Sequence, residues 1–102
     1  MINVIASICV KTGKIADYLT ILKANMQAIK KEKGYIEYVP TVDIDAKLPL
    51  QVLDNNVITI LEKWESIEAF HAHLKASHML DYREKIKTMI ESVSVKVLQE
   101  VK

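Results

Sequence analysis

The stretch from Trp64 to Tyr82, WESIEAFHAHLKASHMLDY, contains the only Trp, the only Phe and all three histidines of the chain. A histidine side chain changes its charge near neutral pH, so it can take a proton from a bound molecule. An indole N–H donates a hydrogen bond while its ring offers a large apolar face. These side-chain types indicate proton transfer on a small molecule, provided that the fold brings them together.

Two of the histidines are candidates for proton transfer. His78 follows Ser77, which we expect to be the N-cap of a helix. The positive end of that helix disfavours an imidazolium, so His78 is predicted to be neutral and able to accept a proton. His73 is expected on a side formed otherwise by Ala69 and Ala76, small residues that leave room beside the ring.

The third histidine, His71, is predicted to have a structural position. It falls within the sector of Ile67, Phe70 and Leu74, which recur at helical spacing. We therefore expect His71 at the boundary of the packed face, with its polar edge satisfied locally.

Glu62 and Trp64 alternate along a predicted strand and so share one of its faces, together with Ile58 and Ile60. A carboxylate in that row either reaches the rim and solvent or belongs to a partly buried site with a raised pKa. Trp64 has two interpretations as well, a large core ring or a ring that contacts a substrate.

Metal and cofactor sites lack the required spacing. Two metal ligands on one helix need a separation of three or four residues, whereas His71, His73 and His78 stand two, five and seven apart. Gly13 and Gly34 are the only glycines, so no glycine-rich loop is available for a nucleotide or flavin phosphate. We predict neither a metal nor a cofactor.

Composition restricts the class of protein. With 102 residues we expect a single domain over residues 1–102. Fourteen Lys and Arg against thirteen Asp and Glu give a net charge of +1, which argues against nucleic acid and anionic membranes as partners. A single cysteine, Cys9, and the lack of a spanning or leader-like segment predict a reducing, cytoplasmic setting without a membrane span.

Apolar periodicity divides the chain into alternating strands and helices. Strands are predicted at Ile2–Val10, Tyr35–Val42, Val57–Glu65 and from Val93 to Val101. Because Pro40 has no backbone N–H, the second strand should lie at an edge or contain a bulge there.

Helical spacing appears between these strands. It runs from Ile15 to Ile29, and again after Ser66, a natural N-cap, with a break near Ala76 and a second stripe from Met79 to Ile90. Residues 43–56 have no regular period and are expected to be a long connection that packs down on the domain.

The resulting order, strand, helix, two strands, helix, strand, predicts an α+β fold of the ferredoxin-like type, with an antiparallel four-stranded sheet and helices on one face. Several strands have apolar residues on both faces, for example Ile5 and Cys9 opposite the row of Ile2 and Val4. A second copy laid sheet against sheet would cover the other face, so we predict a two-fold homodimer of the dimeric α+β barrel type.

The chain resembles the antibiotic biosynthesis monooxygenase family of small dimeric proteins. Similarity extends over nearly the whole length, and its most specific part is the run EKWES at residues 62–66, followed by HL at 73–74 and SHM at 77–79. Within the family the chain is most similar to the quinol monooxygenases, which share the long connection after the second strand.

The resemblance implies oxidation of a quinol or related phenol by dioxygen without metal or prosthetic group. On this basis His78 is our first candidate for the base, and His73 assists or replaces it, while Trp64 orients the substrate. Three further side chains are then expected to bind the substrate: the aromatic Tyr38 and Phe70, and the acidic Glu62.

Three alternatives remain open. Haem-degrading relatives use an Asn on the first strand where this chain has Ala6, which argues against that activity. Another branch acts on a phosphorylated signalling molecule. A phosphate group needs cationic side chains beside it, and Arg83 is the only arginine of the chain. The third alternative is a non-catalytic dimeric module that binds a small molecule, with Trp64 only part of the core.

Overall fold

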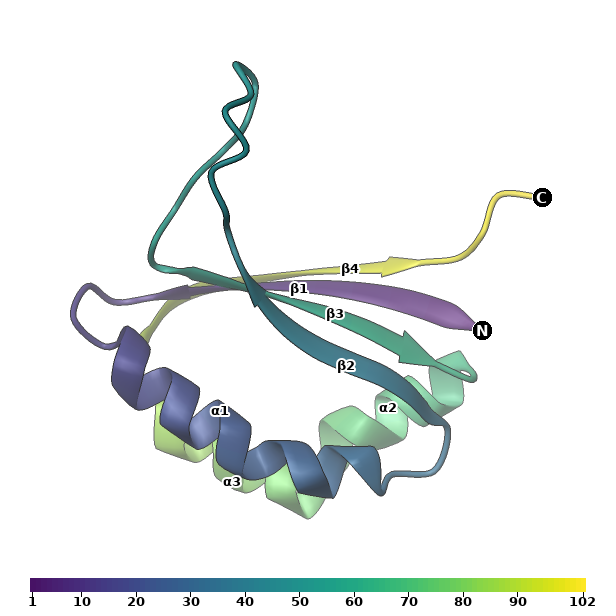
Figure 1. The fold of residues 1–102 in the computed structure, drawn as a ribbon. Coiled ribbons are helices and arrows are strands. Elements are labelled where there is room, and N and C mark those ends of the chain that lie inside the picture. Colours follow the sequence, from purple (N-terminus) through teal and green to yellow (C-terminus); the bar gives the residue numbers. More distant parts are fainter.

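A computed structural model describes all of residues 1–102. Its three helices lie on one face of a four-stranded sheet (Figure 1). The elements in chain order are β1 (Ile2–Val10), α1 (Ile15–Lys30), β2 (Tyr35–Val42), β3 (Val57–Trp64), α2 (Ile67–Lys75), α3 (Ser77–Ile86) and β4 (Ile90–Leu98). None of the helices is long and apolar enough to cross a membrane.

The sheet has the strand order β2-β3-β1-β4, and every neighbouring pair is antiparallel. This confirms the predicted ferredoxin-like α+β fold. Pro40 lies on β2, an edge strand, as predicted from its missing N–H. The irregularity in the β2 ladder occurs between Tyr35 and Glu37, near the start of the strand, and not at Pro40.

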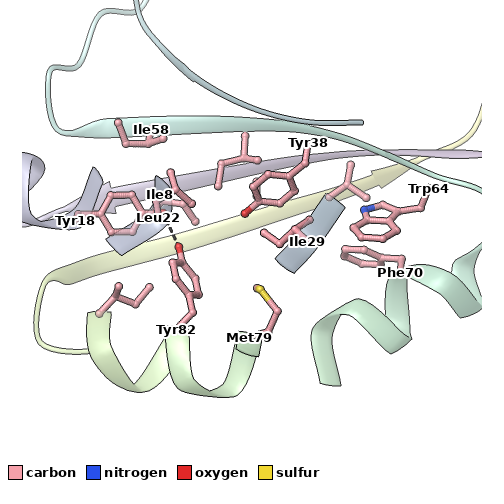
Figure 2. Packing of buried hydrophobic residues seen from close by; sticks show 14 of the residues in the cluster. Ile8, Tyr18, Leu22, Ile29, Tyr38, Ile58, Trp64, Phe70, Met79 and Tyr82 are labelled. Atoms are coloured by element: carbon pink, nitrogen blue, oxygen red, sulfur yellow. Dashed lines mark hydrogen bonds between the residues drawn. The ribbon is translucent and has the colours of Figure 1, made fainter. Parts of the chain in front are cut away.

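The core lies between the sheet and the helices (Figure 2). Alternation along β1 buries Ile2, Val4, Ala6, Ile8 and Val10 on the helix side, as predicted. Helix α1 adds a buried stripe at spacings of four and seven residues, made of Tyr18, Leu22 and Ile29.

The second helical region breaks at Ala76, as predicted. The Ala76 backbone is extended, with φ −60° and ψ 141°, and it ends α2 and begins α3. Ser66 caps α2, since its hydroxyl accepts a hydrogen bond from the Ala69 N–H at 3.1 Å. The prediction of Ser77 as a cap is wrong: Ala76 is the N-cap because its own carbonyl accepts the first bonds of α3, and Ser77 is already helical.

Two further boundaries differ from the sequence-based prediction. Helix α3 ends at Ile86, and β4 covers Ile90–Leu98 instead of residues 93–101. Met89 and Ile90 therefore belong to the turn and the strand, although their spacing continues the helical stripe. Helical and extended conformations both place such a pair of apolar residues near the core, so periodicity could not distinguish them.

The connection between β2 and β3, residues 43–56, does not pack down on the domain. It rises from the face of the sheet opposite the helices (Figure 1). Its apolar side chains are exposed, most of all Leu50, which is 96% exposed. On the same face of the sheet, Val39 and Leu61 are 42% and 40% exposed. The homodimer stays a prediction, and these exposed apolar residues are the surface that a second copy would cover.

Gly34 closes the turn between α1 and β2, and replacing it by alanine should destabilise the fold. Its φ is +84°, and an added Cβ would lie 2.5 Å from the Ala69 Cβ. The left-handed conformation costs an alanine about 1–2 kcal/mol, and a core overlap costs a further 1–3 kcal/mol or so. We expect Gly34→Ala to lower the free energy of unfolding by about 2–4 kcal/mol in urea titrations followed by Trp64 fluorescence.

Gly13→Ala is the matched control for this prediction. Gly13 has a φ of +85°, but an added Cβ would meet nothing within 4 Å. Only the conformational cost should remain there, about 1–2 kcal/mol. If Gly34→Ala and Gly13→Ala lost the same free energy of unfolding, the structure would accommodate the new contact with Ala69 at no cost.

Candidate active site

Glu62 is a buried carboxyl on the helix-facing side of β3, only 7% exposed. The Trp64 indole Nε1 donates a hydrogen bond to its Oε1 at 3.0 Å. Burial raises the pKa of Glu62 to about 7; the indole bond opposes this shift, and the nearby charge of Glu32 adds to it. Of the two interpretations given above, the position at the solvent-exposed rim is wrong, because the Glu62 carboxyl is buried and its pKa is raised.

His73 comes from α2 and is also buried, at 2% exposure. Its ring lies in an aromatic box, with the ring centres of Trp64, Tyr38 and Phe70 at 4.6, 5.9 and 6.2 Å. Nδ1 donates to Glu32 Oε2 at 2.8 Å. Nε2 therefore carries the lone pair in the neutral ring, and it faces Glu62 Oε1 at 4.0 Å.

Burial lowers the pKa of His73, and the hydrogen bond to Glu32 opposes that shift. The ring is thus held neutral inside the protein, with one nitrogen fixed as a donor and the other free to accept.

The helical face assigned to α2 from the sequence is right for Phe70 and wrong for its other members. His71 is exposed, and Ile67 and Leu74 are 50% and 37% exposed, whereas Phe70 and His73 point inward. A histidine can replace an aliphatic residue on the inner face because Glu32 satisfies its N–H. That compensation comes from a residue 41 positions away, so the local pattern could not reveal it.

Glu32 is the residue that sequence reasoning missed. It lies just after α1, in the lysine-rich segment KKEKG, where a solvated side chain is the ordinary expectation. Its carboxylate is instead 14% exposed and lies between two imidazoles, His73 and His78.

His78 lies on the far side of Glu32. Its Nδ1 donates to Asn25 Oδ1 at 2.9 Å, and the Asn25 amide donates to Met79 Sδ at 3.2 Å. Its Nε2 lies 3.3 Å from Glu32 Oε2, yet this buried nitrogen has no hydrogen-bond partner. His78 does line a polar groove of about 270 Å³ between α1 and α3, with Asn25, Asp81 and Lys85.

A smaller and mostly apolar cavity of about 150 Å³ lies between the sheet, α2 and α3. Figure 2 shows Tyr38, Phe70, Met79 and Tyr82 pointing into this region. The cavity is lined by Val4, Ala6, Ile8, Tyr38, Ile60, Glu62, Phe70, His73, Leu74, Met79, Tyr82, Arg83, Ile86, Val93 and Val95. A cavity of about 150 Å³ can hold a benzene-sized ring. Val93 and Val95 are about half exposed, so the cavity opens at the β4 edge.

The predicted site residues are distributed around this cavity in three ways. Tyr38, Glu62, Phe70 and His73 line it. Trp64 is fully buried behind them, with its N–H already used by Glu62. His78 belongs to the groove on the other side of Glu32.

The arrangement suits a hydroxyl-bearing aromatic ring. The 4.0 Å between His73 Nε2 and Glu62 Oε1 is too long for a direct hydrogen bond but allows one hydroxyl oxygen to contact both atoms. Arg83 reaches the rim, where its guanidinium donates to the Leu74 carbonyl oxygen. No group of three or more His, Cys, Asp or Glu side chains is arranged to hold a metal ion.

Comparisons with known proteins agree with this fold. The family model described as antibiotic biosynthesis monooxygenase matches residues 1–85. The "Probable quinol monooxygenase YgiN" of Escherichia coli K12 is 31% identical over 104 aligned positions, which cover 97% of each chain.

Solved structures support the same assignment at the level of the fold. A conserved protein from Methanosarcina mazei Go1 superposes with a TM-score of 0.84 at 18% identity, covering 98% of this chain and 92% of that one. Rv0793 from Mycobacterium tuberculosis gives 0.82 at 20% identity, covering 99% and 95%. Because the family model covers most of the chain and the YgiN similarity covers nearly all of it, the chain belongs to the antibiotic biosynthesis monooxygenase family.

Proposed function

We propose that the chain is a cofactor-independent monooxygenase that oxidises a quinol or a related phenol with dioxygen. The observation that carries this proposal is an apolar cavity in which a neutral imidazole nitrogen and a carboxyl oxygen stand 4.0 Å apart. Family membership and the name of the YgiN relative support it.

In the proposed reaction His73 is the base. A phenolic O–H placed between His73 and Glu62 gives its proton to Nε2, which has the lone pair because Nδ1 donates to Glu32. The phenolate then transfers electrons to dioxygen. One oxygen atom enters the ring, the other leaves as water, and the quinol is oxidised to a hydroxyquinone, so atoms and electrons balance.

The other side chains hold the reactants. Glu62, with its pKa of about 7, is present in both protonation states near neutral pH and can donate to or accept from the substrate hydroxyl. Trp64 fixes the Glu62 carboxyl through Nε1, which is a less direct role than contact with the substrate. Tyr38 and Phe70 face the ring of the substrate, and the mostly apolar lining favours an aromatic over a phosphorylated molecule.

A homodimer through the open face of the sheet is the second part of the proposal. Val39 and Leu61 on that face, and Leu50 in the β2–β3 connection, are exposed apolar residues that a second copy would cover. Light scattering should then give twice the mass of the 11.6 kDa chain.

The test of the catalytic proposal is oxygen uptake by purified, metal-stripped protein supplied with a single-ring hydroquinone, freshly reduced menadiol or a naphthol. We expect protein-dependent uptake and label from ¹⁸O₂ in the hydroxylated product. Uptake no faster than buffer with every phenol would contradict the proposal. If menadione still quenched Trp64 fluorescence in that case, the binding-module alternative would be favoured.

A further inference from the structure

The cavity and the polar groove lie on opposite sides of a single carboxylate. Glu32 Oε2 accepts from His73 Nδ1 at 2.8 Å on the cavity side and lies 3.3 Å from His78 Nε2 on the groove side. His73 lines the cavity, and His78 lines the groove. The three side chains therefore form a continuous row from the buried site to the surface.

We propose that His73, Glu32 and His78 are a proton relay that carries the substrate proton from the cavity to the groove between α1 and α3. The inference rests on the proposed function, since it assigns an exit to the proton that His73 would take. His78 thereby has a role although it lies outside the cavity.

The relay requires only proton transfers between neighbouring atoms. When the substrate O–H bond breaks and the His73 Nε2–H bond forms, the Nδ1–H proton passes to Glu32 Oε2. Glu32 then passes its proton to His78 Nε2, and the groove gives it to solvent or buffer. These transfers leave His73 protonated on Nε2 alone. When the departing oxygen atom is reduced to water, His73 Nε2–H protonates it, and a proton returns from His78 through Glu32 to Nδ1. Each group thereby recovers its starting state, and the overall reaction releases no net proton.

The unpaired nitrogen of His78 supports this role. Because Nδ1 donates to Asn25, Nε2 is the ring nitrogen that faces Glu32 Oε2, at 3.3 Å. No other side chain forms a hydrogen bond with this nitrogen. It is therefore placed to take a proton from Glu32 without competition.

Other charged and titratable groups surround the relay and must be considered in any pH profile. Around His73, the sheet contributes Glu62 and Tyr38, and α3 contributes Arg83. Around His78, the groove contributes Asp81 and Lys85. None of them stands between Glu32 and either imidazole in the contacts described above.

The decisive experiment compares His78→Ala with Glu32→Gln at low buffer concentration, with and without added imidazole. His78→Ala should lower kcat by about tenfold or more with KM unchanged, and imidazole entering the vacated space should restore it. Glu32→Gln keeps an acceptor for His73 Nδ1 but cannot carry a proton. Its kcat should therefore also fall, and added imidazole should not restore it. His71→Asn, an exposed neighbour, is the control.

A second measurement does not depend on turnover. In ¹⁵N-labelled protein, the side-chain resonances of His73 and His78 should titrate as a coupled pair, and Glu32→Gln should uncouple them. Unchanged turnover of His78→Ala, a loss that imidazole does not restore, or independent titrations in the wild type would overturn the relay. A wild type without any oxygen uptake would overturn the proposed function, while the titrations would still show whether the three groups share a proton.

Discussion

Replacement of His73 by asparagine is expected to lower kcat by a factor of about 10² to 10⁴, the usual contribution of a general base. The asparagine amide can occupy the position of Nδ1 and still donate to Glu32, so the buried carboxylate keeps its partner. What disappears is the lone pair of Nε2, which faces Glu62 at 4.0 Å. The measurement is steady-state oxygen uptake with a reduced quinol, together with a circular dichroism spectrum to confirm folding.

His71→Asn makes the same chemical change two residues earlier, at an exposed position on the same helix. We expect it to keep wild-type kcat and KM. If folded His73→Asn turned over at the wild-type rate, His73 would not be the base.

The order of elements could be predicted because each has its own period and ends at an identifiable residue. Alternation in β1 and β3 and the left-handed Gly34 after α1 are local properties of a few residues. Likewise, Glu62 could be singled out because a carboxylate in an apolar row is unusual wherever the strand lies.

The organisation of the site could not be predicted, because it depends on contacts between distant segments. Glu32 and His73 are 41 residues apart, and Asn25 and His78 are 53 apart. A polar residue on the inner face of α2 is stable only when such a partner is present. Without the partner, helical spacing favoured Ile67 and Leu74 over His73, and the prediction for that face failed.

The connection at residues 43–56 shows a second limit. Its apolar residues suggested packing within the domain, but the chain places them on the open side of the sheet, where Leu50 is 96% exposed. Hydrophobicity indicates that a residue tends to be covered; it does not say whether the covering surface belongs to the same chain.

Glu62→Gln is expected to stabilise the protein at alkaline pH and to leave its stability at acid pH nearly unchanged. The pKa of Glu62 rises from an ordinary 4.5 to about 7 in the folded protein, mainly through burial. For a raised pKa, the stabilising contribution is complete below the unfolded value and disappears as pH rises through the folded value. At about 1.4 kcal/mol per tenfold change in proton affinity, this interval corresponds to about 3 kcal/mol lost by the wild type between pH 4.5 and 7.

Glutamine has nearly the same shape, can accept the Trp64 indole hydrogen bond and never ionises, so the variant should escape this loss. Urea unfolding of both proteins across this pH range, followed by Trp64 fluorescence, measures the difference directly. The shift of His73 is present in both proteins and should largely cancel. Glu65→Gln alters an exposed carboxylate just beyond the same strand and should leave the pH dependence as it is.

A wild type that is as stable as Glu62→Gln at pH 8.5 would mean that the carboxylate is solvated in the folded protein, and the buried-site assignment would fail. The expected gain in stability should coincide with a loss of turnover, because the same carboxyl contacts the proposed substrate hydroxyl. If Glu62→Gln is more stable than the wild type and yet inactive, Glu62 has a catalytic role and not only a structural one. A group that served only the fold would have no reason to remain ionisable at a cost of about 3 kcal/mol.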